Sequence, residues 1–218
     1  MGIDHTLKFR EQFRQKIPKL YSGVFHLLFN FSLLLLTFIF PLTQIKNFKP
    51  IELWVIPVVL ILGNAVVFFI HKYPLHRQSK LFKFAYTIHS KYHHVFFTDK
   101  VLVFETTKDF YILFFPTWVV LGFVLTYFPL LYFGGPYLFS LNIIYLAMSM
   151  GSLYFLLYEI LHFCSHLPES HPILRVPGVR YMWNHHKTHH DPKLMGSYNF
   201  NIVYPLMDIL MGTKYKKD

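Results

Sequence analysis

The sequence predicts an all-α integral membrane protein, with four transmembrane helices and a cytosolic helical cap. Three observations predict this class. The composition is 54% hydrophobic and only 15% charged, whereas a soluble domain carries about 25% charged residues. Four apolar runs are long enough to cross a membrane. Eleven of the 14 histidines gather in four clusters, and all four clusters lie outside these runs.

The four apolar runs define the predicted transmembrane helices, at about residues 23–40, 51–70, 110–128 and 136–160. Crossing a hydrocarbon core of about 30 Å takes roughly 20 apolar residues. A tight reversal is expected between the third and fourth helices, where Pro and Gly residues follow one another. We expect residues 1–218 to form a single integral-membrane domain, since nothing in the sequence suggests two.

The polar segments 71–109 and 161–218 form the predicted cap, and the distribution of Lys and Arg orients it. The N-terminal segment carries 5 of these residues, and the two cap segments carry 7 each. The connection at 41–50 has 2, and the turn at 129–135 has none. The positive-inside rule therefore places both termini and every histidine cluster in the cytosol. The membrane that holds the protein is expected to be that of the endoplasmic reticulum in a eukaryote, or the inner membrane in a bacterium.

The net charge of +10 does not indicate a nucleic-acid-binding protein. The Lys and Arg residues lie in the gaps between apolar runs instead of on one basic face, and membrane-side charge bias explains them better. Cys164 is the only cysteine, which excludes an intramolecular disulfide and a thiolate metal cluster.

The histidine clusters have the spacing of metal ligands on helices. His89/His93, His162/His166, His185/His189 and His186/His190 are each four residues apart. Residues four apart share one face of an α-helix, so each pair is expected to converge on one ion. His94 and His189 lie beside these pairs and can turn toward a neighbouring ion. His71 and His76 are five apart, a poor spacing for an α-helix, and we expect Pro74 to bend the segment so that the two serve different ions.

The number and type of these candidate ligands narrow the choice of metal ion. Imidazole suits zinc, copper, iron and nickel. One tetrahedral zinc takes at most four protein ligands, and about ten clustered histidines exceed that number. Two six-coordinate ions would use them well, and two irons that react with dioxygen fit this description, although a purified sample could carry zinc. The cap is therefore predicted to carry a histidine-rich dimetal site, with no catalytic residue beyond the metal ligands. The ten candidate ligands are His71, His76, His89, His93, His94, His162, His166, His186, His189 and His190.

Four further residues are candidates for a metal ligand or for a hydrogen-bond partner of a ligand: His185, Glu159, Asp191 and Asn184. Glu159 precedes His162 by three residues and could orient its imidazole or simply cap the span. For Asp191 and Asn184 the two interpretations are evenly balanced. A surface tract that binds metal adventitiously is the alternative for the clusters as a whole, but four clusters with helical spacing on one side of the membrane disfavour it.

With these residues placed, the chain resembles the fatty acid hydroxylase/sterol desaturase superfamily of integral-membrane diiron enzymes. The resemblance lies in the ordered histidine boxes and in the ending from Asn199 to Thr213, and it covers roughly residues 63–213. The second box departs from the pattern, with three residues before its double histidine where many members have two. His185 is an additional histidine beside the last box; His186 gives the family spacing to His189 and is preferred as the ligand.

The resemblance implies a lipid oxygenase that hydroxylates a C–H bond of an acyl chain. Its partners would be a membrane lipid substrate, dioxygen and an external electron donor, either a reductase or a small haem cytochrome, because the sequence has no His-Pro-Gly-Gly haem motif. Desaturation of a sterol or another lipid on the same scaffold remains open. From another class, a histidine-lined metal transporter is disfavoured because the clusters lie beyond the span ends. A lipid-binding membrane protein without turnover is the last alternative.

Overall fold

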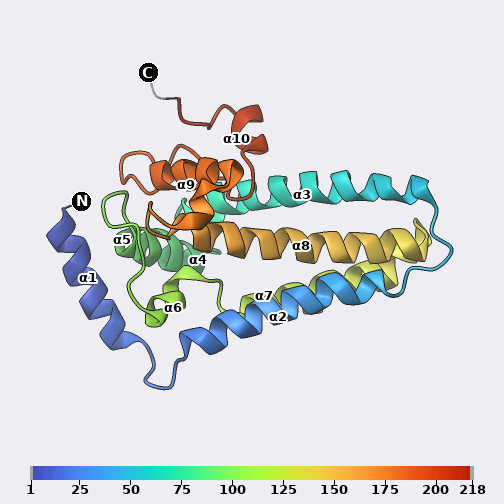
Figure 1. Ribbon diagram of the computed structural model, residues 1–218, viewed down its shortest axis with the longest axis horizontal. Helices are drawn as coiled ribbons and strands as arrows, with labels where there is room; N and C mark the ends of the chain where they lie inside the picture. Colours follow the sequence, from blue (N-terminus) through green and yellow to red (C-terminus); the bar gives the residue numbers. More distant parts are fainter. Residues whose placement is uncertain (1, 217–218) are drawn as a thin grey trace. The chain divides into compact units, whose positions relative to one another are not determined.

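The computed structural model describes residues 2–216, and within that range the chain is built from helices, with no β-strand. The all-α class is therefore confirmed. Four helical segments are long and apolar enough to cross a membrane, and this makes the chain an integral membrane protein (Figure 1). These segments are Gly23–Leu42, Pro50–Leu75, Thr117–Tyr137 and Leu141–Ser165.

The chain divides into two compact units, each assembled from separated stretches. The cap unit comprises Met1–Gly23, Asn64–Phe114 and Ile160–Asp218, and it contains every histidine cluster. The span unit comprises Val24–Gly63 and Phe115–Glu159. Both units therefore draw on both halves of the sequence. The expectation of a single domain stays a prediction.

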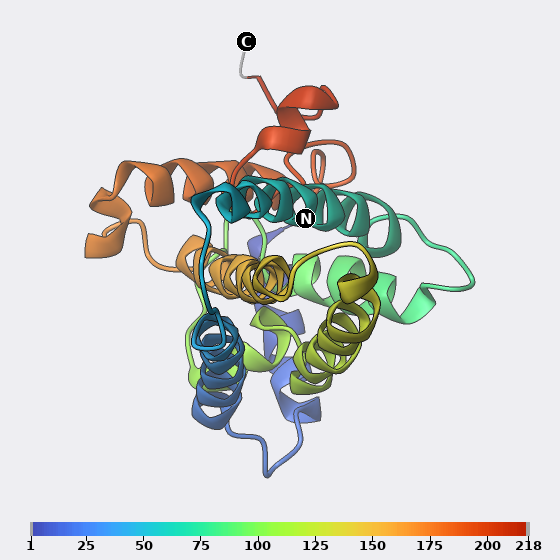
Figure 2. The ribbon, with the colours of Figure 1, turned by 90° about the vertical axis from the view of Figure 1, so that its right-hand side faces the viewer.

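The span unit consists mainly of apolar helices. Figure 2 looks nearly along α2, α7 and α8, which appear there as separate coils seen end-on. The unit contains most of α2 (Gly23–Leu42), η1 (Pro50–Trp54), the first part of α3 (Val55–Ile70), α7 (Thr117–Pro129) and most of α8 (Leu141–Ser165).

Two glycines let the helices of the span unit approach closely. A Cβ on Gly63 of α3 would lie 2.8 Å from the ring of Tyr154 in α8. A Cβ on Gly151 of α8 would lie 2.5 Å from the ring of Tyr127 in α7. The Tyr127 hydroxyl donates to the carbonyl of Ala147 over 2.8 Å, which fixes that ring against α8. Small residues serve the same purpose in membrane helices generally, where backbones must come close to gain packing contacts.

The third and fourth spans lie further along the chain than the sequence predicted. Phe110–Leu113 forms a separate short helix, α6, and α7 begins only at Thr117. The break falls at Pro116, which lacks an N–H and disfavours a helical residue before it. The expected reversal at 129–135 is instead helical: α7 runs through Pro129 into the π-helix η5 (Leu130–Gly134). After the short 3-10 helix η6 (Gly135–Tyr137), the chain turns and the fourth span begins at Leu141.

The cap unit is built from short helices joined by loops. Its centre contains buried aromatic rings, and Phe96, Phe97 and Phe200 are inaccessible to solvent. The first of its helices buries Thr6, Arg10 and Phe13. The elements are α1 (Ile3–Lys16), η2 (His71–Leu75), α4 (Lys83–Tyr86), η3 (Thr87–His93), α5 (His94–Phe96), η4 (Thr107–Asp109), α6, η7 (Pro172–Arg175), α9 (Pro177–His189) and α10 (Leu206–Leu210).

Candidate metal centre

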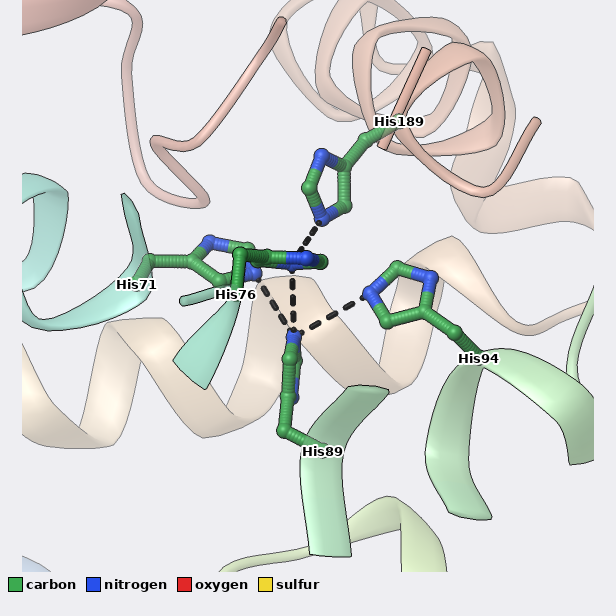
Figure 3. A group of neighbouring side chains, drawn as sticks. All are labelled: His71, His76, His89, His94 and His189. Carbon is green, nitrogen blue, oxygen red and sulfur yellow. Dashed lines mark hydrogen bonds between the residues drawn. The ribbon is translucent and has the colours of Figure 1, made fainter. Parts of the chain in front are cut away.

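The ten histidines that the sequence singles out as ligands converge in two groups within the cap unit. In each group, one ring nitrogen per histidine lies within 4.8 Å of the corresponding nitrogen of every other member. Figure 3 shows the first group, whose five rings direct nitrogen atoms toward a common centre. The first group is His71, His76, His89, His94 and His189, and the second group is His93, His162, His166, His186 and His190.

Two π-helices, each with the residue that directly follows it, supply four of the five histidines of the first group. His71 and His76 bracket η2, and His89 and His94 lie in and directly after η3. Hydrogen bonds of a π-helix join residues five apart, so residues at this spacing become neighbours on one face. The Nε2 atom of His89 lies 2.9 Å from that of His71, 3.2 Å from that of His76 and 3.1 Å from that of His94. A spacing of five residues, which separates two side chains on an α-helix, therefore brings the histidines together in these π-helical segments.

This geometry differs from the pairing expected on α-helical spacing. His71 and His76 were expected to serve different ions, but both belong to the first group. His89 and His93 were expected to converge on one ion, but they belong to different groups. The cause is the wider turn of η3, which brings His89 into register with His94.

The ends of two α-helices supply four of the five histidines of the second group in the expected way, and His93 at the end of η3 is the fifth. His162 and His166 lie at the end of α8, and His186 and His190 lie at the end of α9. The Nε2 atom of His186 is 3.2 Å from that of His166 and 2.9 Å from that of His190. The two groups adjoin each other, because the rings of His94 and His190 stack with centroids 4.3 Å apart.

Backbone carbonyls fix the orientation of several of these imidazoles. A carbonyl oxygen can only accept, so each Nδ1 bonded to one carries the proton and its Nε2 keeps the lone pair. This is the tautomer that a metal ligand needs, and such partners are typical of ligating histidines. These bonds include those from His71 to Phe200, from His93 to Ile112 (3.0 Å), from His166 to Leu102 (2.8 Å), from His189 to Tyr198 (2.8 Å) and from His190 to Phe97 (2.6 Å).

The hydrogen bonding of the second group fits a bound cation. His166 and His190 both direct Nε2 lone pairs at Nε2 of His186, which can offer at most one proton there. Within residues 2–216, Nε2 of His93 is buried and has no hydrogen-bond partner. Burial, followed by the neighbouring histidines, lowers the pKa of His186 and His190, which disfavours an additional proton. A metal ion at the centre would accept all of these lone pairs, and imidazole donors suit iron, zinc, copper or nickel.

His185 lies outside both groups and has a different role. Its Nε2 is 3.0 Å from Oδ2 of the buried Asp208. Asp208 also accepts hydrogen bonds from the backbone N–H groups of Phe200 and Asn201 and from the hydroxyl of Thr213. Although burial alone raises the pKa of the Asp208 carboxyl, the hydrogen bonds with His185 and these other donors hold it below its usual value. The carboxylate thereby fixes the loop whose Phe200 carbonyl orients His71.

The other three candidates are not members of either histidine group. Glu159 lies in the span unit, where its Oε1 accepts from the backbone N–H of Phe115 at 3.2 Å. Asp191 accepts from the backbone N–H of Lys193 at 2.8 Å and thereby closes a local turn. Asn184 is exposed on α9. Asp208 is a residue that sequence reasoning missed, although the stretch that contains it contributed to the family resemblance.

Comparison with known proteins supports the same architecture. No protein-family model matches the sequence, and no curated protein matches it. Among solved structures, the fold is similar to that of a chain described as full-length Scs7p in which only the hydroxylase domain is visible. The TM-score is 0.56, at 16% sequence identity. The alignment covers 87% of this chain and 62% of the Scs7p chain, so this chain spans less than two thirds of the length of the Scs7p chain. The fold that the resemblance implied is therefore confirmed.

Proposed function

We propose that this chain is a membrane-bound diiron oxygenase that hydroxylates a C–H bond of a lipid acyl chain. It would use dioxygen, with electrons from a separate reductase or small haem cytochrome. The proposal rests above all on the two adjoining groups of five histidines. Five imidazoles leave one position of a six-coordinate ion open for an exchangeable ligand, which a closed structural site would not. The likeness to a hydroxylase domain agrees with this proposal.

The ligands proposed are the ten histidines of the two groups. Two bound irons would supply the activation of dioxygen and the oxidation of the C–H bond. The chain's own residues would hold the ions, direct Nε2 lone pairs inward and keep water out. Burial serves the last of these tasks, since His166, His189 and His190 are inaccessible to solvent. The distribution of Lys and Arg supports a site on the cytosolic side.

Comparison of lipids from cells with and without the protein tests this function. We expect mass spectrometry to find lipids that gain one oxygen atom when the wild-type chain is expressed. His93→Ala removes a ligand of the second group and should abolish both this product and the binding of one ion. His171→Ala is the matched control, since His171 is exposed and belongs to neither group, and it should leave both unchanged.

The outcome separates the proposed reaction from its alternatives. Loss of two hydrogens from a lipid, in place of the gain of oxygen, would identify a desaturase on the same scaffold. An unchanged lipid profile with a wild-type chain that holds two ions would favour a transporter or a lipid-binding protein. Full activity in His93→Ala would refute the ligand assignment.

A further inference from the structure

Arg10, on α1, is a buried cation far in sequence from the histidines. Its side chain is 1% exposed, and it reaches the segment 96–105, which connects α5 to η4. Nε donates to the carbonyl of Phe96 at 2.7 Å, Nη2 to that of Val101 at 2.7 Å and Nη1 to that of Val103 at 3.0 Å. Nη1 also pairs with Glu105 at 3.1 Å. One guanidinium therefore holds three carbonyls of a loop in place.

The same loop binds two histidines of the second group through its other carbonyls. Phe97 accepts from Nδ1 of His190, and Leu102 accepts from Nδ1 of His166. The backbone adds two bonds in the opposite direction, from Asp99 N–H to the His190 carbonyl at 3.2 Å and from Phe104 N–H to the His166 carbonyl at 3.4 Å. The loop thus lies between Arg10 and these two histidines. Some of its carbonyls accept hydrogen bonds from Arg10, and the neighbouring carbonyls accept from the histidines.

Arg14, one helical turn further along α1, holds a second carbonyl-bearing segment. Its guanidinium makes two 2.8 Å hydrogen bonds to the buried carboxylate of Asp109. Asp109 directly precedes α6, where the Ile112 carbonyl accepts from Nδ1 of His93. Two arginines of one helix therefore support the carbonyl partners of three of the five histidines in the second group.

We propose that Arg10 is a positioning residue for the ion of the second group: it fixes the 96–105 loop, whose carbonyls orient His166 and His190. The inference rests on the proposed metal site. The first group depends on different supports, because its carbonyl partners Tyr198 and Phe200 lie in the loop that Asp208 holds. Loss of Arg10 should therefore loosen one ion and spare the other.

The test measures metal content and the rate of metal release to excess EDTA, using the full chain in detergent micelles. Arg10→Met keeps most of the side-chain length and removes the guanidinium. We expect it to speed release of one of the two ions by about 10- to 100-fold, the usual effect of losing a partner that orients a ligand. Arg10→Lys keeps the charge but cannot bridge three carbonyls, so its effect should be intermediate. Lys8→Met removes an exposed charge from the same helix and should change nothing.

Ligand variants then identify which ion is affected. His89→Ala should leave only the ion of the second group, and Arg10→Met in that background should speed its release. His93→Ala should leave only the ion of the first group, and Arg10→Met there should have no effect. If Arg10 had a purely structural role, Arg10→Met would speed the release of both ions equally. That result, or release of both ions at the wild-type rate, would overturn the inference. If Arg10→Met does not fold, the same comparisons with Arg10→Lys decide. A wild-type chain that binds no metal would instead refute the proposed function.

Discussion

At the scale of single residues, the hydrogen bond made by one ring nitrogen of a histidine determines whether the other ring nitrogen can offer a lone pair. Where Nδ1 donates to a carbonyl, as in His71 with Phe200 or His93 with Ile112, Nε2 must present a lone pair. His185 shows the contrast, because its Nε2 faces the carboxylate of Asp208 and not the histidine groups. Neighbouring histidines in one helix therefore have separate roles, one as a proposed ligand and one as support for a loop.

This difference gives a direct prediction for His185 and His186. His186→Ala removes a member of the second group, so we expect metal analysis of the purified protein to show the loss of one ion. His185→Ala leaves both groups intact and should keep both ions, with at most faster release from the first group because Asp208 loses one partner. Loss of an ion from His185→Ala together with full retention in His186→Ala would contradict this assignment.

At the scale of elements, helix type determines how the histidines divide between the two groups. The sequence was sufficient to identify all ten histidines, since their clustering is visible in the order of residues. It was not sufficient to assign His89 and His93 to different groups, because an α-helix was assumed where the chain forms the π-helix η3. The support from Arg10 was equally inaccessible, since its contacts join residues 86 to 95 positions apart.

The span unit offers a prediction about helix packing. Gly151→Ala would place a methyl group against the Tyr127 ring, which its hydrogen bond to Ala147 prevents from moving freely. We expect a loss of about 1–3 kcal/mol in the free energy of unfolding, as for other overpacked sites. Gly122→Ala in α7 is the matched control, because nothing lies within 4 Å of its added Cβ. It should be neutral or slightly stabilising, since alanine favours helix.

Thermal unfolding in detergent, followed by circular dichroism, measures both glycine variants under the same conditions. A lower midpoint for Gly151→Ala alone would support the close approach of α7 and α8 within the span unit. Equal midpoints for the two variants would show that the Tyr127 ring has room to move and that the packing is looser than described.

At the scale of the whole molecule, histidines of both groups lie where apolar helices end. His71 directly follows α3, and His162 and His166 lie at the end of α8. The apolar runs were recognisable in the sequence from length and composition. The boundaries of the helices were harder to predict from the sequence, because the break at Pro116 and the helical course through Pro129 depend on local backbone geometry. The chain thus combines four helices able to cross a membrane with a separate unit that gathers the histidines.

Anomalous scattering at the iron absorption edge, from crystals of protein purified from iron-replete cells, locates the bound metal directly. We expect two peaks, one among His71, His76, His89, His94 and His189, and the other among His93, His162, His166, His186 and His190. If zinc has replaced iron, the same two positions should appear at the zinc edge. No peak within either histidine group at the edge of any first-row metal, or a single peak elsewhere in the chain, would contradict a dimetal centre.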